Sequence, residues 1–116
     1  MQFNTVTSEV GFSPTKIAQV LRTSKSEIAT TLGLGSDALT RQQRLASPKT
    51  QTRLRQMLEI LNRVEPQTGS LLAAYAWFRS QPLPGFGGMT PDQLVRDGHA
   101  DWVHRYLGRV MAGGYA

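Results

Sequence analysis

Helix-start signals recur along this chain and constrain its fold more than any other feature. A hydroxyl residue followed by proline occurs at Ser13-Pro14, Ser47-Pro48 and Thr90-Pro91. The hydroxyl can cap the first turn of a helix, and proline is tolerated at the first helical position, where its missing N–H would have no partner. Val and Ile never alternate with polar residues over a strand length, so strand signals are nearly absent. The pattern predicts an all-α protein of about seven helices.

The first half of the chain predicts three short helices. The first begins at Ser13-Pro14. The second begins at the capping-box sequence Ser24 to Glu27 and ends at Gly33, a residue type suited to the left-handed position after a helix. The third spans Ser36 to Leu45. Two short helices joined by a tight glycine-containing turn form the helix-turn-helix pattern.

The longest predicted helix begins at Ser47-Pro48. We expect it to end near Val64, because Pro66 biases the residue before it away from helical dihedral angles. Its apolar residues cover more than one narrow stripe, so it should pack on the first three helices on one side. The C-terminal helices, or a second copy of the chain, should cover its other side. Residues Met1 to Phe12 carry no predicted element.

Three further helices are predicted in the second half, after Ser70, from Thr90-Pro91 and from about Ala100. The segment from Gln81 to Met89 contains two prolines and three glycines and cannot continue a helix. Gly113-Gly114 should end the last helix.

The positive charge is confined to the first half. The chain has 13 Lys and Arg against 8 Asp and Glu, which gives a formal net charge of +5. Residues 1–64 contain nine bases and four acids, whereas residues 65–116 contain four of each. A localised positive field is typical of a polyanion-binding module joined to a neutral one. A solvated basic face without a partner is the alternative.

Residues suited to DNA recognition lie in and after the expected third helix. Arg can pair bidentately with guanine and Gln with adenine, while basic side chains near a helix N-terminus suit phosphate contacts. The predicted DNA-binding residues are Thr40, Arg41, Gln43, Arg44, Lys49 and Arg53. Helical packing with basic residues facing solvent would produce the same composition.

Groups for catalysis or metal binding are sparse. His99 and His104 are separated by about 140° around a helix, so they cannot share a metal on one helix face. The sequence Gly85-Phe86-Gly87-Gly88 lacks the preceding strand and following lysine of a phosphate-binding loop. We therefore expect no catalytic residue, no metal and no cofactor, and a chain that is not an enzyme. A small hydrolase using one of the histidines is the remaining alternative.

The cysteine count and the apolar pattern bear on localisation. The chain has no cysteine, which excludes a disulfide scaffold and thiolate metal ligands. It also lacks a signal-peptide pattern and an apolar run of the roughly 20 residues needed to cross a bilayer. These features predict a cytoplasmic protein with no membrane partner.

An ordered series of residues in the second half resembles a known family. The series is Trp77-Phe78, Pro82-Leu83-Pro84, Gly87-Gly88, Thr90-Pro91, Leu94, Gly98, Val103, Leu107-Gly108-Arg109 and Gly113-Gly114-Tyr115. It is similar to the toxin-binding domain of the Xre/MbcA/ParS antitoxins. The helix-turn-helix region before it is similar in placement to the N-terminal Xre-like region of the same family.

The resemblance implies the antitoxin of a type II toxin–antitoxin module whose toxin carries a RES domain. Such toxins resemble ADP-ribosyltransferases in fold and act on NAD, and the antitoxin obstructs the active-site entrance with its C-terminal region. The implied division is an Xre-like helix-turn-helix DNA-binding region at residues 1–65 and a toxin-binding domain at residues 66–116. The resemblance also implies a homo-oligomer, most simply a dimer, that binds its own operator.

Most of the residues expected to contact the toxin are aromatic or lie at the C-terminus. Aromatic side chains are typical interface anchors, and the terminal carboxylate could pair with cationic groups that otherwise hold NAD phosphates. The predicted toxin-binding residues are Phe86, Arg96, Trp102, Gly113, Gly114, Tyr115 and Ala116. Trp77, Val103 and Leu107 are expected in the core. The alternative function is a free-standing helix-turn-helix repressor whose C-terminal half only dimerises.

Overall fold

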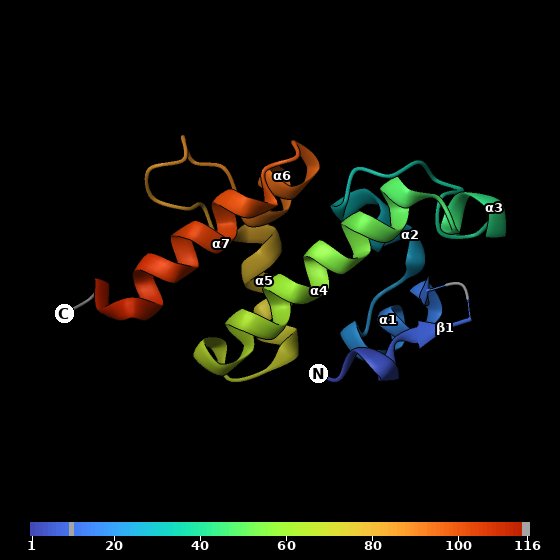
Figure 1. Ribbon diagram of the computed structural model, residues 1–116, viewed down its shortest axis with the longest axis horizontal. Coiled ribbons are helices and arrows are strands. Elements are labelled where there is room, and N and C mark those ends of the chain that lie inside the picture. The colour runs from blue at the N-terminus through green and yellow to red at the C-terminus, as the bar shows by residue number, and fades with distance from the viewer. Residues whose placement is uncertain (10, 115–116) are drawn as a thin grey trace.

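The structure, a computed structural model, describes residues 1–9 and 11–114 and is helical apart from one short hairpin (Figure 1). The helices are α1 Pro14–Leu21, α2 Lys25–Thr31, α3 Gln42–Leu45, α4 Pro48–Thr68, α5 Leu71–Ser80, α6 Pro91–Arg96 and α7 Ala100–Arg109. A π-helical turn, η2 Val110–Gly114, continues α7. The prediction of an all-α protein is confirmed. No helix in the described part of the chain is long and apolar enough to cross a membrane.

The helix starts follow the hydroxyl residues. Ser13, Ser24, Ser47 and Ser70 each accept a hydrogen bond from the backbone N–H three residues further on. Thr90 begins α6 as part of a capping box with Gln93, whose side chain accepts from the backbone N–H of Thr90 at 3.0 Å. Each bond satisfies an N–H group that has no partner inside the helix.

Helix α4 is the central element, with α1, α2 and α3 toward one end of the molecule and α5, α6 and α7 toward the other (Figure 1). Its buried residues are Thr50, Leu54, Met57, Leu58, Ile60, Leu61 and Val64. One hydrophobic cluster runs from Val6 and Ile17 through this helix to Phe78 and Leu107. The division expected between residues 65 and 66 therefore falls within a helix that both halves pack against.

The expected third helix, Ser36 to Leu45, is wrong over most of its length, because only its last four residues form α3 and residues 36–40 form turns. The carbonyl oxygen of Asp37 accepts the N–H groups of Thr40 at 3.2 Å and Arg41 at 3.0 Å, and the Thr40 hydroxyl at 3.3 Å. A hydroxyl that bonds nearby backbone competes with helical hydrogen bonding, and so short a helix is marginal by itself.

Helix α4 continues beyond its expected end near Val64. It runs through Pro66 to Thr68, and Gly69 ends it with a φ of 91° and an N–H that donates to the Glu65 carbonyl at 2.9 Å. Pro66 is exposed in the last turn of the helix. The bias against helix before proline is overcome here, because helical continuation keeps Val64 buried at 2% exposure.

The N-terminal residues left unassigned from the sequence contain a 3-10 turn, η1 Phe3–Thr5, and two antiparallel strands. Strand β1, Thr7–Ser8, pairs with β2, Gly11–Phe12. The backbone N–H of Phe12 donates to Oε1 of Gln51 on α4 at 2.8 Å. Strands of two residues show no alternating pattern, so the sequence offers no signal for this hairpin.

Candidate functional site

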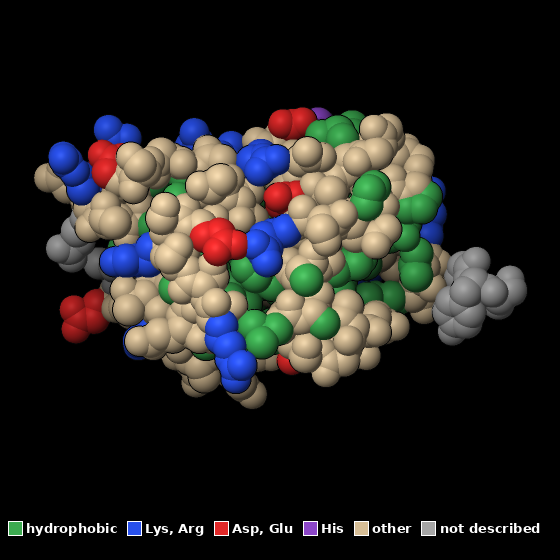
Figure 2. Space-filling model, turned by 180° about the vertical axis from the view of Figure 1, so that it is seen from behind, with side chains coloured by type: hydrophobic (Ala, Val, Ile, Leu, Met, Phe, Trp, Pro, Cys, Tyr) green, Lys and Arg blue, Asp and Glu red, His purple; other side chains and the backbone are tan. Residues whose placement is uncertain are grey.

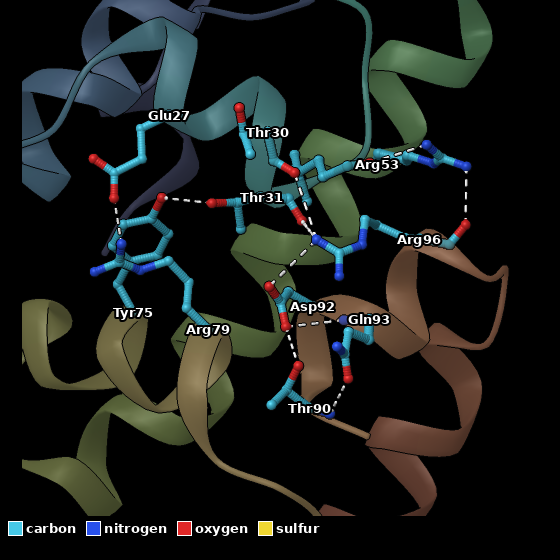
Figure 3. A network of polar contacts seen from close by, with 11 residues as sticks. Glu27, Thr30, Thr31, Arg53, Tyr75, Arg79, Thr90, Asp92, Gln93 and Arg96 are labelled. Atoms are coloured by element: carbon cyan, nitrogen blue, oxygen red, sulfur yellow. Dashed lines mark hydrogen bonds and ion pairs between the residues drawn. The ribbon is translucent and has the colours of Figure 1, made fainter. Parts of the chain in front are cut away.

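Arg53, in the second turn of α4, bonds three backbone carbonyls. Its Nη1 donates to the carbonyl oxygens of Leu32 at 2.9 Å and Gly33 at 3.1 Å, just after α2. Its Nη2 donates to the carbonyl oxygen of Arg96, at the end of α6, at 3.1 Å (Figure 3). One guanidinium therefore joins the ends of two helices from opposite halves of the chain.

Arg96 completes this contact from the other side. Its Nη1 donates to the carbonyl oxygens of Thr31 at 3.2 Å and Thr30 at 3.5 Å, and lies 3.6 Å from the Asp92 carboxylate (Figure 3). Asp92 is 7% exposed and also accepts the backbone N–H of Gln93 at 2.9 Å. Cationic groups stabilise the carbonyl end of a helix, here α2. We call Arg53 and Arg96 the arginine latch.

The latch bears on two of the residues selected from the sequence. Arg53 is predicted to contact DNA and Arg96 to contact the toxin, and both guanidinium groups bond backbone carbonyls of their own chain. Either contact with a partner would have to share or replace these bonds. The sequence contains no signal that these two arginines lie together.

The other predicted DNA-binding residues lie at the end of the molecule that carries α3. Thr40, Arg41, Gln43, Arg44 and Lys49 are all exposed. Lys and Arg side chains gather at this end, on the left of Figure 2. The Asp37 carboxylate lies 3.6 Å from Arg41 Nε and 4.0 Å from Arg44 Nη1. These exposed ion pairs are screened by water and leave both arginines accessible.

Helix α7 carries two apolar stripes. The first stripe, Ala100, Val103 and Leu107, is buried, as expected for the latter two. The second stripe consists of His99, just before the helix, Trp102, Tyr106 and Val110, at successive separations of three or four residues, which places them on one face. His99, Trp102 and Tyr106 are partly exposed and Val110 is 40% exposed. We call this set the aromatic stripe.

Phe86, from the loop between α5 and α6, packs against the aromatic stripe. Its ring centroid lies 6.1 Å from that of Trp102 and 6.3 Å from that of Tyr106. The His99 ring stacks on the Trp102 ring, with the ring centroids 3.7 Å apart and an interplanar angle of 12°. The predicted toxin-binding residues Phe86 and Trp102 are therefore neighbours. Gly113 and Gly114 lie in η2, whereas Tyr115 and Ala116 lie outside the described residues.

An apolar groove of about 260 Å³ adjoins the aromatic stripe. Val64, Gln67 and Thr68 line it from the end of α4, and Trp77 lines it from α5. Tyr106, Leu107, Val110 and Met111 line it from α7 and η2. Trp77, expected in the core, is only partly buried. The groove was not predicted, because the spacing of Tyr106 and Val110 matches that of ordinary core residues and no sequence signal shows which stripe of α7 is covered.

Among the described residues, His104 and Tyr75 have pKa values that are clearly shifted. Burial lowers the pKa of His104, and the nearby Arg63 guanidinium, which donates to the His104 carbonyl at 3.0 Å, lowers it further. Burial raises the pKa of Tyr75, whose hydroxyl lies 3.3 Å from the Thr31 hydroxyl (Figure 3). Within residues 1–9 and 11–114, no three His, Asp or Glu side chains form a group suited to a metal ion.

Residues 68–113 match the family model described as the antitoxin Xre/MbcA/ParS C-terminal toxin-binding domain. The match covers α5, α6, α7 and most of η2, and therefore includes the aromatic stripe and most of the groove lining. Residues 68–113 are therefore similar to the toxin-binding domain of Xre/MbcA/ParS antitoxins, which confirms the resemblance found in the sequence. Neither the curated proteins nor the solved structures yielded a match.

Proposed function

We propose that this chain is the antitoxin of a type II toxin–antitoxin module and neutralises a RES-domain toxin that acts on NAD. The C-terminal domain binds the toxin and occludes its active-site entrance, and the N-terminal half binds operator DNA. The chain acts in the cytoplasm, as an oligomer and without catalysis of its own. The observation that carries the proposal is the match of residues 68–113 to a toxin-binding domain.

Two features of the C-terminal half support binding of a protein partner. The aromatic stripe and Phe86 offer partly exposed aromatic surface, which is enriched in the energetically important centres of protein interfaces. In Figure 1, α7 and η2 extend to one end of the molecule, so the last residues follow an element at its edge. We propose that Gly113 to Ala116 enter the toxin's NAD cleft.

The charge distribution supports DNA binding by the N-terminal half. Five of the six residues predicted to contact DNA are exposed: Thr40 and Arg41 lie just before α3, Gln43 and Arg44 in α3, and Lys49 in the first turn of α4. Basic side chains there can contact phosphates together. Arg53 takes a different part in this proposal: through the arginine latch it positions the segment between α2 and α3.

Co-expression with the polypeptide encoded in the adjacent reading frame tests the proposal. The tagged chain should co-purify with that polypeptide and suppress its consumption of NAD. A variant lacking Gly113 to Ala116 should still co-purify but protect NAD less well. Absence of a complex with the full chain would contradict the proposed function, while full protection by the shortened chain would contradict only the role of the tail.

A further inference from the structure

The aromatic stripe and the apolar groove form one continuous surface. Tyr106 belongs to both, because its ring packs against Phe86 and also lines the groove. Val110 likewise ends the stripe and lines the groove, and its side chain is 40% exposed. The surface therefore runs from Trp102 along α7 to the point where η2 begins, four residues before Gly114.

The size and lining of the groove indicate what it can hold. Its volume of about 260 Å³ lies below the roughly 300 to 1,000 Å³ typical of small-molecule sites. The lining is mainly aliphatic and aromatic, with Gln67 and Thr68 at the end of α4 as its polar members. The Thr68 hydroxyl donates to the Ser70 carbonyl at 3.0 Å and so is already engaged. One or two apolar side chains of a protein suit this space better than a polar cofactor.

A second copy of the chain is a less suitable occupant. Among the described residues, the most exposed large hydrophobic side chains are Leu72, at 39%, and Val110, at 40%, and Val110 belongs to the groove itself. Apart from the aromatic stripe and the groove themselves, the described surface therefore offers few exposed large apolar side chains with which another copy could fill the groove. Stable symmetric interfaces bury about 800 Å² on each partner. The toxin-binding domain, in contrast, contains six of the eight groove-lining residues.

We propose that an apolar side chain of the toxin inserts into this groove, and that the segment carrying it packs along the aromatic stripe. The inference rests on the proposed function and specifies which surface the toxin occupies. It places Val110, Tyr106 and Met111 among the toxin contacts, in addition to the residues predicted from the sequence. The groove would hold the toxin near the C-terminal residues, Gly113 to Ala116, that we propose enter the NAD cleft of the toxin.

A matched pair of charge substitutions in the full-length chain tests this inference. Val110→Glu should weaken toxin binding by about tenfold or more, because a carboxylate would be buried in an apolar contact without a partner. Leu72→Glu, at an equally exposed position of 39%, should change the dissociation constant by less than about twofold. The toxin affinity of Val110→Ala should lie between the affinities of wild type and Val110→Glu. Circular dichroism and thermal unfolding check that all three variants fold.

Each outcome of these titrations has a defined meaning. Val110→Glu and Leu72→Glu with equal, near wild-type affinities would overturn the inference. A change in the oligomeric state of free Val110→Glu, with toxin affinity unchanged, would assign the groove to self-association and also overturn it. Wild-type chain that fails to bind the toxin would overturn the proposed function itself, a result visible before any variant is compared.

Discussion

The Nη2 atom of Arg53 donates a hydrogen bond to the backbone carbonyl oxygen of Arg96 at 3.1 Å. These two arginines form the latch at the end of α2, one from the central helix and one from α6, within the residues that match the family model. The turn that follows α2 is thus positioned by residues far away in the sequence. The domain that carries the family match also supports the basic half of the molecule.

Replacing Arg53 with Ala should lower the free energy of unfolding by about 1.5 to 3 kcal/mol, because carbonyls that accept from a charged donor lose their partner. The free energy of unfolding of the Arg53→Lys variant should lie between those of wild type and Arg53→Ala, because a single ammonium cannot reach all three carbonyls as the guanidinium fork does. Urea unfolding measures the change, with Arg55→Ala at an exposed position of the same helix as control. Equal stability of the Arg53→Ala and Arg55→Ala variants would show that the latch contributes nothing.

Replacing Gly33 with Ala should destabilise the chain by about 1 to 3 kcal/mol, because Gly33 has a φ of 64° that disfavours a β-carbon. The added β-carbon would also lie 2.7 Å from Cδ of Arg96, so the latch would have to shift. In an Arg96→Ala background this second penalty disappears. The double-mutant cycle should therefore give a coupling energy of at least about 0.5 kcal/mol, and additive effects would count against the close approach of the two residues.

His104 should make stability depend on pH near neutrality. Its pKa in the folded chain lies below its ordinary value of 6.5, so the unfolded chain binds more protons in this range. The stabilisation is therefore present above pH 6.5 and is lost as the pH falls from 6.5 toward the folded pKa. His104→Asn should reduce this dependence in unfolding titrations between about pH 7.5 and 5.5. An equal slope for the variant would assign the dependence to other groups.

The salt dependence of DNA binding should reflect the basic residues that face outward. Of the six bases from Arg41 to Arg63, Arg53 belongs to the latch and Arg63 bonds His104. Four phosphate contacts would give a log-log slope of about −3.6, at −0.9 per contact. Fluorescence anisotropy on a random-sequence duplex over a range of NaCl concentrations measures it. A slope near −5 would show that all six bases bind phosphates, and a slope near zero would contradict DNA binding.

The helices that the sequence predicted well are those with both a start signal and a long apolar face. The start signal Ser47-Pro48 and the apolar residues after it both predict a helix, and α4 begins at Pro48 as expected. The segment from Ser36 to Thr40 buries only the adjacent pair Ala38 and Leu39, which do not repeat at a helical spacing, and its Thr40 hydroxyl and Asp37 carboxylate bond locally. Local hydrogen bonding favours turns over a helix in that segment, and the periodicity of apolar residues does not reveal such bonding.

The candidate site was predictable to the extent that it depends on residue type. Phe86 and Trp102 were selected as exposed aromatic residues, and the structure brings them together. The groove depends on which stripe of α7 is left uncovered by α4 and α5, which is a property of packing between helices. The internal bonds of Arg53 and Arg96 likewise depend on tertiary contacts between residues 20 to 66 positions apart, so their sequence positions alone suggested surface roles.

The most direct test of the central claim is the rate at which the purified toxin consumes NAD, measured while the full-length chain is titrated in. If the chain occludes the NAD site, the rate should fall to near zero once enough chain has been added to bind all of the toxin. A stable complex that consumes NAD at the rate of the free toxin would contradict the claim.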